Sequence, residues 1–423
     1  MADVTAHEGP ILAADGTPLK RSLARALRAQ KLRALALIAP LLIFIIIAFL
    51  LPITDMLLRS VDNKIVKETL PLTVEALKDW DETSGEAPGE EVFKAFHADM
   101  LPAVKAKTHT QVARRLNFEV PGIASLFRKT GRRIKKMDPE VSLKDQFLKV
   151  NEKWGEPETW QTVKRYSANP TGAYFARSVD MRFGDDGLES RPENERIFVF
   201  LFVRTLIMSV VITLSCLLIG YPIAYLLATL PVRTSNLLMI LVLLPFWTSL
   251  LVRTSAWKVL LQDQGVINEI LVWIGLLDTD NRLALINNQT GTIIAMTHIL
   301  LPFMILPLYS VMKTIPPSYV RAAKSLGATN WTAFWRVYFP QSVPGIGAGA
   351  ILVFILAIGY YITPEIVGGT SGVFISNQIA YYISSSSYNW GFAAALGSIL
   401  LVVVLILYWC YDKIVGIDNV KLG

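Results

Sequence analysis

The sequence predicts an all-α membrane protein with about six transmembrane helices and a large, mainly helical insert between the first two. Three observations predict this class. Of the 423 residues, 52% are hydrophobic and only 18% are charged; the mean hydropathy is positive; and the apolar residues gather in long runs. The formal net charge of +7 then has a topological meaning, because basic residues collect on the cytoplasmic side of membrane spans.

Six runs are long and apolar enough to cross a bilayer. Several of them contain proline, which a helical bundle tolerates where neighbouring groups or water satisfy the freed backbone, so we expect kinked helices around a pathway. The prolines concerned are Pro222, Pro245, Pro302 and Pro307. The predicted spans are residues 35–57, 197–228, 236–257, 291–312, 343–362 and 391–412.

The basic residues predict how these spans are oriented. Lysines and arginines crowd the stretch 20–33 before the first span, and the loop 313–342 contains four more, whereas 363–390 holds a single charged residue, Glu365. By the positive-inside rule both termini and the 313–342 loop are expected to be cytoplasmic. The resulting division is a cytoplasmic tail (1–34), the first transmembrane helix (35–57), a periplasmic insert (58–196) and a core with five further helices (197–415).

The insert is charged and has no spanning run. Apolar residues at helical spacing follow Asp138, which we expect to cap a helix, and a second short helix is expected over 156–167. The glycine-containing charged stretches 85–91 and 184–195 are typical of linkers. The basic run 127–136 is interpreted as a solvated helix face, and no nucleic-acid partner is expected. From its position alone, the insert is a candidate lid or docking platform.

The chain carries no pattern typical of an enzyme. The phosphate-binding pattern GxxxxGK[ST] is absent from the sequence, and none of the four histidines has metal-ligand spacing. Cys216 and Cys410 lie inside apolar runs, which favours packing over a disulfide or a metal site. His298 is interpreted as a core or pore residue. We therefore expect no catalytic residue, no metal and no cofactor bound by this chain.

The stretch SYVRAAKSLGATNWTAFWRVYFP (318–340) is basic and contains no acid. Pro316 and Pro317 predict the end of the preceding helix, and Ser318 is expected to cap a short helix that ends at Gly327. A second short helix, capped by Asn330, is expected to stop at Pro340. Small residues here would let another protein approach closely, but an interfacial helix on lipid headgroups fits the same residues.

Residues 321–340 of this stretch resemble the cytoplasmic EAA loop of permease subunits of binding-protein-dependent ABC importers, the MetI-like superfamily. In that loop Glu-Ala-Ala is followed by a glycine, an aromatic residue and Leu-Pro; here arginine replaces the glutamate and Phe339 the leucine. The resemblance implies a coupling helix that sits in a groove of the ATPase. The implied coupling residues are Arg321, Ala322, Ala323, Lys324, Gly327, Ala328, Phe334 and Pro340.

Residues 243–268, 300–323 and 354–369 resemble the polyamine (spermidine/putrescine) branch of these permeases in order and interval. The resemblance implies a pathway for a small charged organic solute, most often a polyamine; opines, aminoethylphosphonate and amino-acid derivatives are the alternatives. It also implies a bacterial inner membrane, a second permease subunit in a heterodimer, two ATPase subunits that hold ATP and Mg, and a periplasmic solute-binding protein. The insert departs from the shorter loop of the better-known polyamine permeases.

Aromatic and acidic groups near the pathway are the candidates for solute contact. A cationic amine could use Trp247, Tyr360 or Tyr361 through cation–π attraction, and Glu365 through its charge. Arg253 could be a gate or solute residue, or an end-of-helix residue that snorkels. The residues alone leave two other classes open: a secondary transporter or channel, for which the spans hold few charges, and an anchor for the insert.

Overall fold

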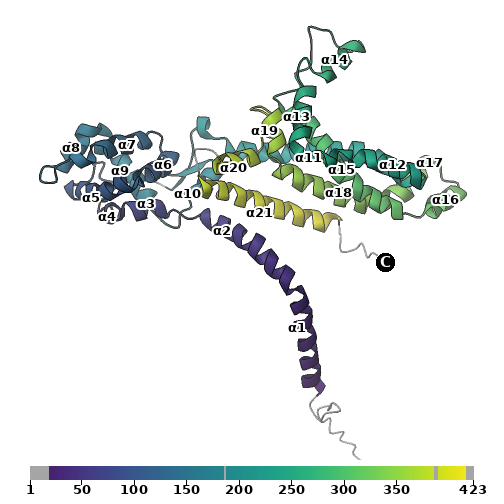
Figure 1. Ribbon diagram of the computed structural model, residues 1–423, viewed down its shortest axis with the longest axis horizontal. Coiled ribbons are helices and arrows are strands. Elements are labelled where there is room, and N and C mark those ends of the chain that lie inside the picture. Colours follow the sequence, from purple (N-terminus) through teal and green to yellow (C-terminus); the bar gives the residue numbers. More distant parts are fainter. Residues whose placement is uncertain (1–18, 185–186, 385–388, 416–423) are drawn as a thin grey trace, which may run out of the picture. The chain divides into compact units, whose positions relative to one another are not determined.

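The computed structural model describes residues 19–184, 187–384 and 389–415, which fall into two compact units, 1–58 and 59–423 (Figure 1). Most of the described chain is helical, and its only strands form one short hairpin. Five helical runs are long and apolar enough to span a membrane, and a bent pair of helices is a sixth candidate. The predicted fold class is confirmed.

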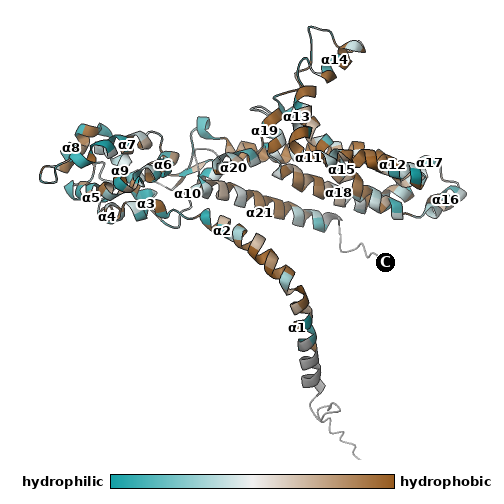
Figure 2. Ribbon diagram, viewed as in Figure 1, coloured by the Kyte–Doolittle hydropathy of each residue, from teal (hydrophilic) through white to brown (hydrophobic). Residues whose placement is uncertain are grey.

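The first unit contains one long helical run. It comprises α1 (Leu19–Ile45), the π turn η1 (Ile46–Leu50) and α2 (Leu51–Arg59), and its candidate span is the mostly hydrophobic stretch Gln30–Arg59 (Figure 2). The helix already includes residues 19–34 of the segment predicted as a tail. The π turn ends at Leu50, two residues before Pro52, whose missing N–H interrupts the ordinary hydrogen-bond ladder.

In the second unit, the insert forms a helical body. The β hairpin pairs Arg182 with Glu189 and occupies part of the predicted linker 184–195. The elements are α3 (Lys64–Thr69), α4 (Pro71–Ala76), α5 (Glu90–Ala106), α6 (His109–Glu119), α7 (Ile123–Arg133), η2 (Ile134–Lys136), α8 (Leu143–Val150), η3 (Glu152–Gly155), α9 (Pro157–Arg165), α10 (Ala173–Ser178), β1 (Met181–Phe183), β2 (Leu188–Ser190) and η4 (Glu193–Glu195).

Aromatic side chains form the core of the insert. Trp154 and Trp160 are fully buried, and each indole N–H has a partner: Trp154 donates to Thr130 Oγ1 and Trp160 to the Trp154 carbonyl, both at 2.9 Å. Buried indoles need such partners. The predicted helix 156–167 is present as α9. The prediction that Asp138 caps the next helix is wrong. Ser142 caps α8, because its hydroxyl accepts a hydrogen bond from the Asp145 N–H.

The membrane core follows the insert. Its elements are α11 (Phe198–Thr229), α12 (Val232–Leu243), η5 (Leu244–Trp247), α13 (Leu250–Leu260), α14 (Val266–Trp273), α15 (Gln289–Thr314), α16 (Pro317–Ser325), α17 (Asn330–Ala333), η6 (Phe334–Tyr338), α18 (Phe339–Gly359), α19 (Ile362–Val367), α20 (Ile375–Ser384) and α21 (Trp390–Val415). The long helices α11, α15, α18 and α21 correspond to four predicted spans.

The predicted span 236–257 is not one continuous helix. The chain bends by 96° between Val232–Trp247 and Leu250–Leu260. Pro245 has no N–H for the helical ladder, and Ser249 starts a new helix because its hydroxyl accepts from the Val252 N–H at 3.2 Å. A kink was expected here; the structure has a break.

Helix α15 is the central helix of the bundle, because 61% of the residues in its membrane-spanning stretch are buried. It runs parallel to α11, since Lys313 near its end donates to the Ala228 carbonyl near the end of α11. It runs antiparallel to α18. The insert therefore joins the start of α11, and the 313–342 loop lies at the opposite end of this 32-residue helix (Figure 1), about 48 Å away.

Candidate coupling surface and translocation pathway

Helix α16 lies at the surface: most of its residues are exposed, Val320 and Ala323 are half-buried, and none is fully buried. It ends in a Schellman motif: Gly327, at φ 90°, donates to the Lys324 carbonyl, and Ala328 donates to the Ala323 carbonyl, both at 3.0 Å. This confirms the helix end expected at Gly327. The motif fixes the turn after α16, and Leu326 projects from it with 90% of its surface exposed.

The helix starts in this loop differ from those expected. Pro316 takes the cap position of α16, with Pro317 as the first helical residue, so Ser318 lies inside the helix. Thr329 rather than Asn330 caps the second helix, because its hydroxyl accepts from the Thr332 N–H at 3.2 Å. In both cases the cap lies one or two residues earlier than predicted.

Pro340 does not stop the second helix. The run Asn330–Gly359 is a single candidate span that contains the π turn η6. Pro340 follows this π turn, and the wider turn accommodates the missing N–H and the ring. The prediction of a separate short helix was therefore wrong. Instead, the chain after α17 is continuous with α18, which gives the loop a rigid connection to the bundle.

The predicted coupling residues divide into two groups. Six lie on or beside α16 as surface residues: Arg321, Ala322, Ala323, Lys324, Gly327 and Ala328. Phe334 instead packs inward, with its ring centroid 6.2 Å from that of Tyr221 in α11. Tyr338 packs against Tyr225 of the same helix at 5.1 Å. The aromatic residues thus fasten the loop to α11, and α16 provides the free face.

Arg253 lies on α13, in the part of the core where α13 meets α15 and α19. Its guanidinium interacts electrostatically with His298 and Tyr360, but its Nε and Nη1 are buried and have no hydrogen-bond partner among the described residues. One turn further on, Trp257 donates to His298 Nδ1 at 3.0 Å. A buried, unsatisfied guanidinium is costly, and such groups mark functional positions in membrane proteins.

The structure brings only some of the predicted pathway residues together. Tyr360 lies within range of the Arg253 charge, but Trp247 is 79% exposed at the end of η5. Glu365, in α19, accepts from Asn377 Nδ2 at 2.7 Å, and the same amide donates to the Tyr361 carbonyl at 2.9 Å. Glu365 therefore has a structural partner as well as an exposed face.

Sequence reasoning missed Trp257 and Asn377. The position of Trp257, four residues after Arg253 in the sequence, was an available signal, since i and i+4 share one helix face. Asn377 gave no local signal, because its partners are twelve and sixteen residues away in the chain. His298, interpreted as a core or pore residue, lies with Arg253, Trp257 and Tyr360, and we call these four residues the Arg253 cluster.

These features define a multi-pass membrane protein with a kinked helical core and a short surface helix that is the candidate coupling segment. The family described as "Binding-protein-dependent transport system inner membrane component" matches residues 202–415, just over half of the chain. The chain belongs to this family and is the permease subunit of an ABC importer. The secondary-transporter and anchor alternatives are thereby set aside.

Two relatives and one solved structure show the extent of the similarity. The spermidine/putrescine transport system permease protein PotB of Salmonella typhimurium (strain SL1344) is 36% identical over 223 residues, covering 52% of this chain and 77% of that protein. The inner membrane ABC transporter permease protein YdcU of Escherichia coli (strain K12) is 32% identical over 226 residues, 51% and 71% of the two chains. A bacterial ABC transporter involved in import of the acidic polysaccharide alginate aligns with TM-score 0.41 and 23% identity, over 53% and 80%.

Proposed function

We propose that this permease forms half of the translocation pathway of a polyamine importer, paired with a second, non-identical permease subunit. Two ATPase subunits bind beneath the pair of permeases, one of them on the α16 surface of this chain, and a periplasmic solute-binding protein delivers the solute. The observation that carries the coupling part is α16 itself: a short helix without a buried residue, fixed by a Schellman turn. The polyamine part is supported by the similarity to PotB.

In this proposal the α16 end of the bundle faces the cytoplasm, where ATP is available. The insert, at the other end of α11, then faces the periplasm. The basic residues Arg321 and Lys324 on the α16 side support this orientation. ATP and Mg bind to the ATPase subunits and not to this chain. Closure of the ATPases pushes α16, and the continuous helix after α17 transmits the movement to the core.

Co-purification with the ATPase tests the coupling surface. The variants Gly327→Asp and Gly327→Asn introduce side chains of nearly equal size, and both residues tolerate a left-handed backbone. They therefore form a matched pair that differs in charge. No atom lies within 4 Å of a Cβ added at Gly327, so both variants should insert and fold. We expect the aspartate to reduce ATPase recovery more than the asparagine. If no ATPase is recovered even with the native loop, the proposal fails.

Arg253 favours a second candidate solute class. Its two unsatisfied guanidinium nitrogens match a carboxylate or phosphonate, whereas a polyamine offers only positive charge. The corresponding solutes carry an amine and an anionic group together, as opines, aminoethylphosphonate and amino-acid derivatives do. In either case the carboxylate of Glu365 would attract the positively charged amine of the solute.

Transport by the reconstituted complex separates the two candidates. With a polyamine, Arg253→Gln should leave uptake unchanged or raise it, because the variant removes a repulsive charge. With an anion-bearing solute, the same change should reduce uptake by about tenfold or more, since a hydrogen bond to a charged group is worth roughly 1.5–3 kcal/mol, and Arg253→Lys should restore part of it. ATP hydrolysis stimulated by each solute with its binding protein gives an independent measurement.

A further inference from the structure

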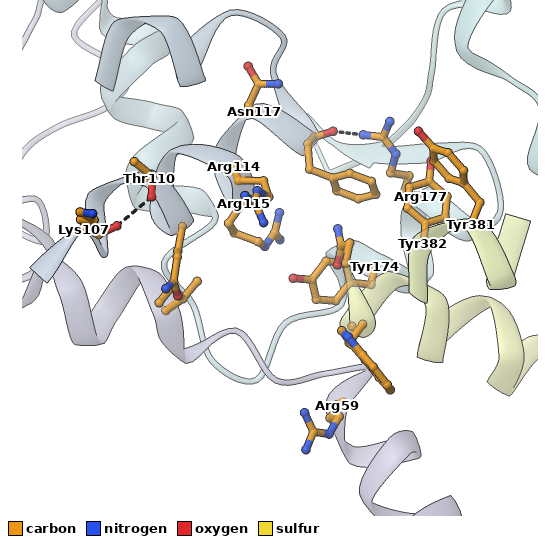
Figure 3. A pocket seen from close by; sticks show the side chains of 16 residues that line it. Arg59, Lys107, Thr110, Arg114, Arg115, Asn117, Tyr174, Arg177, Tyr381 and Tyr382 are labelled. Atoms are coloured by element: carbon orange, nitrogen blue, oxygen red, sulfur yellow. Dashed lines mark hydrogen bonds between the residues drawn. The ribbon is translucent and has the colours of Figure 1, made fainter. Parts of the chain in front are cut away.

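A cavity of about 970 Å³ lies where the insert meets the membrane helices (Figure 3). Helices α6 and α10 line it from the insert, and α20 and the start of α21 line it from the core. Aromatic contacts hold the two sides together: Phe118 of α6 lies 4.8 Å from Phe392 of α21, measured between ring centroids. The cavity belongs to neither the coupling surface nor the Arg253 cluster.

The charge of the cavity lining is one-sided. Five basic side chains line it, and no carboxylate of the described residues does. The basic residues are Arg59, Lys107, Arg114, Arg115 and Arg177. Such a concentration of like charge raises the local concentration of anions.

Arg115 is the most buried of these cations. It is 6% exposed, donates through Nε to Asn63 Oδ1 and through Nη1 to Glu119 Oε1, both at 2.9 Å, and stands 4.5 Å from the centre of the Tyr174 ring (Figure 3). Its Nη2 has no hydrogen-bond partner among the described residues. A buried donor without an acceptor destabilises the folded protein. An acceptor from outside the chain would relieve this cost at Arg115 Nη2.

The ion pairs behind the cavity leave a positive excess. Glu119 is shared by Arg115, Arg191 at 2.8 Å and Arg177 at 3.9 Å, and Arg191 also pairs with Glu195. Three guanidinium groups therefore face two carboxylates. Burial, helped by the like charge of Arg191, lowers the pKa of Arg177. An anion in the cavity would compensate this excess.

The position of the cavity indicates the source of the anion. Trp390 lines it and is the first residue of the candidate span Trp390–Lys413. Tyr381 also lines it, and both aromatic side chains are exposed. Tyrosine and tryptophan at a span end lie at headgroup level, and basic pockets beside transmembrane helices bind anionic headgroups.

We propose that this cavity binds the phosphate group of an anionic phospholipid headgroup, in the leaflet on the side of the insert. Arg114 and Lys107 attract the headgroup from the surface, and Arg115 Nη2 donates to a phosphate oxygen. The bound lipid holds the insert against the membrane. This proposal does not depend on the transported solute.

Binding to the purified full-length chain in detergent tests the proposal. The probes are dihexanoyl phosphatidylglycerol, dihexanoyl phosphatidylcholine and inorganic phosphate, followed by calorimetry. The double variant Lys107→Gln/Arg114→Gln removes two exposed cations from the cavity. Its matched control is Arg132→Gln/Lys136→Gln, which removes two exposed cations from α7 and η2 that do not line the cavity. Thermal unfolding checks that all proteins are folded.

We expect phosphatidylglycerol to bind better than phosphatidylcholine. The cavity variant should weaken phosphatidylglycerol binding by roughly thirtyfold, since each of the two basic residues contributes roughly 1 kcal/mol to such attraction and about 1.4 kcal/mol corresponds to a factor of ten. The control should bind like the native chain. Equal binding by all three proteins overturns the proposal. Binding of inorganic phosphate without phosphatidylglycerol keeps the phosphate site but overturns the lipid source.

Discussion

The carboxylate of Asp180, in the insert, accepts a hydrogen bond from the backbone N–H of Phe198, the first residue of α11, at 3.1 Å. It also accepts from the N–H groups of Ile197 at 3.1 Å and Val199 at 2.8 Å. One side chain thus satisfies three N–H groups at the start of a 32-residue helix, where a negative charge is also favourable. This contact attaches the insert to the membrane core.

Replacing Asp180 should therefore destabilise the protein. We expect Asp180→Ala to lower the free energy of unfolding by about 1–2 kcal/mol from the lost cap, with some added cost because residue 180 has φ 59°. Asp180→Asn keeps one acceptor and tolerates this backbone, so it should lose less. Denaturant titration of the purified chain in mild detergent measures both. An alanine variant as stable as the native chain would contradict the capping role.

The buried carboxylate of Glu119 should matter more than an exposed one. Glu119→Gln leaves the arginines around it without a full counter-charge, and breaking such a buried pair costs about 3–5 kcal/mol. The matched control is Glu75→Gln, which breaks the exposed Glu75–Lys78 pair at 2.6 Å and should change stability little. The same denaturant titration compares them; equal effects would show that the arginine cluster needs no counter-charge.

Close packing of α18 on α15 requires glycine at position 349. A Cβ added at Gly349 would lie 2.7 Å from Met304 Sδ and 3.1 Å from the Met304 carbonyl oxygen. The methionine sulfur can move, but the backbone oxygen cannot, so Gly349→Ala should cost about 1–3 kcal/mol. In Gly359→Ala, at the end of the same helix, the added Cβ meets nothing within 4 Å, and no comparable loss is expected. Thermal unfolding in one detergent separates the two variants.

The insert should lose stability at alkaline pH. Burial raises the pKa of Tyr174 above its usual value of 10.0, and the pKa of Tyr166 is raised for the same reason. The folded insert therefore holds these protons more tightly than the unfolded chain. This contribution is complete below pH 10 and is lost as the pH rises through the folded-state pKa values. Tyr174→Phe should flatten the decline in melting temperature above pH 10; an unchanged decline would contradict the assignment.

Local signals predicted the long helices and failed at their interruptions. The runs that became α11, α15 and α21 were found because a spanning helix needs about twenty apolar residues whatever surrounds it. The break after Trp247 and the continuity through Pro340 were both missed. In each case a proline indicates an irregularity in the helix. Whether the chain turns there or continues as a helix depends on helix-capping residues and on the helices packed beside it.

The candidate sites also divide into those that local sequence indicates and those that only folding brings together. The candidate coupling residues from Arg321 to Ala328 lie close together in the sequence, so a motif could point to them, and Gly327 ends α16 as its backbone freedom predicts. The Arg253 cluster and the basic cavity could not be found in this way, because their residues are far apart in the chain. His298 and Trp257 are 41 residues apart in the sequence and form a hydrogen bond.

The sequence by itself determined the membrane class, five of the spans and the helix end at Gly327, since these depend on composition and on neighbouring residues. Only the tertiary structure decided which charges are buried and unsatisfied, as at Arg115 and Arg253. Satisfaction of a buried charge depends on groups that folding brings within about 3 Å, and residue order does not specify those distances.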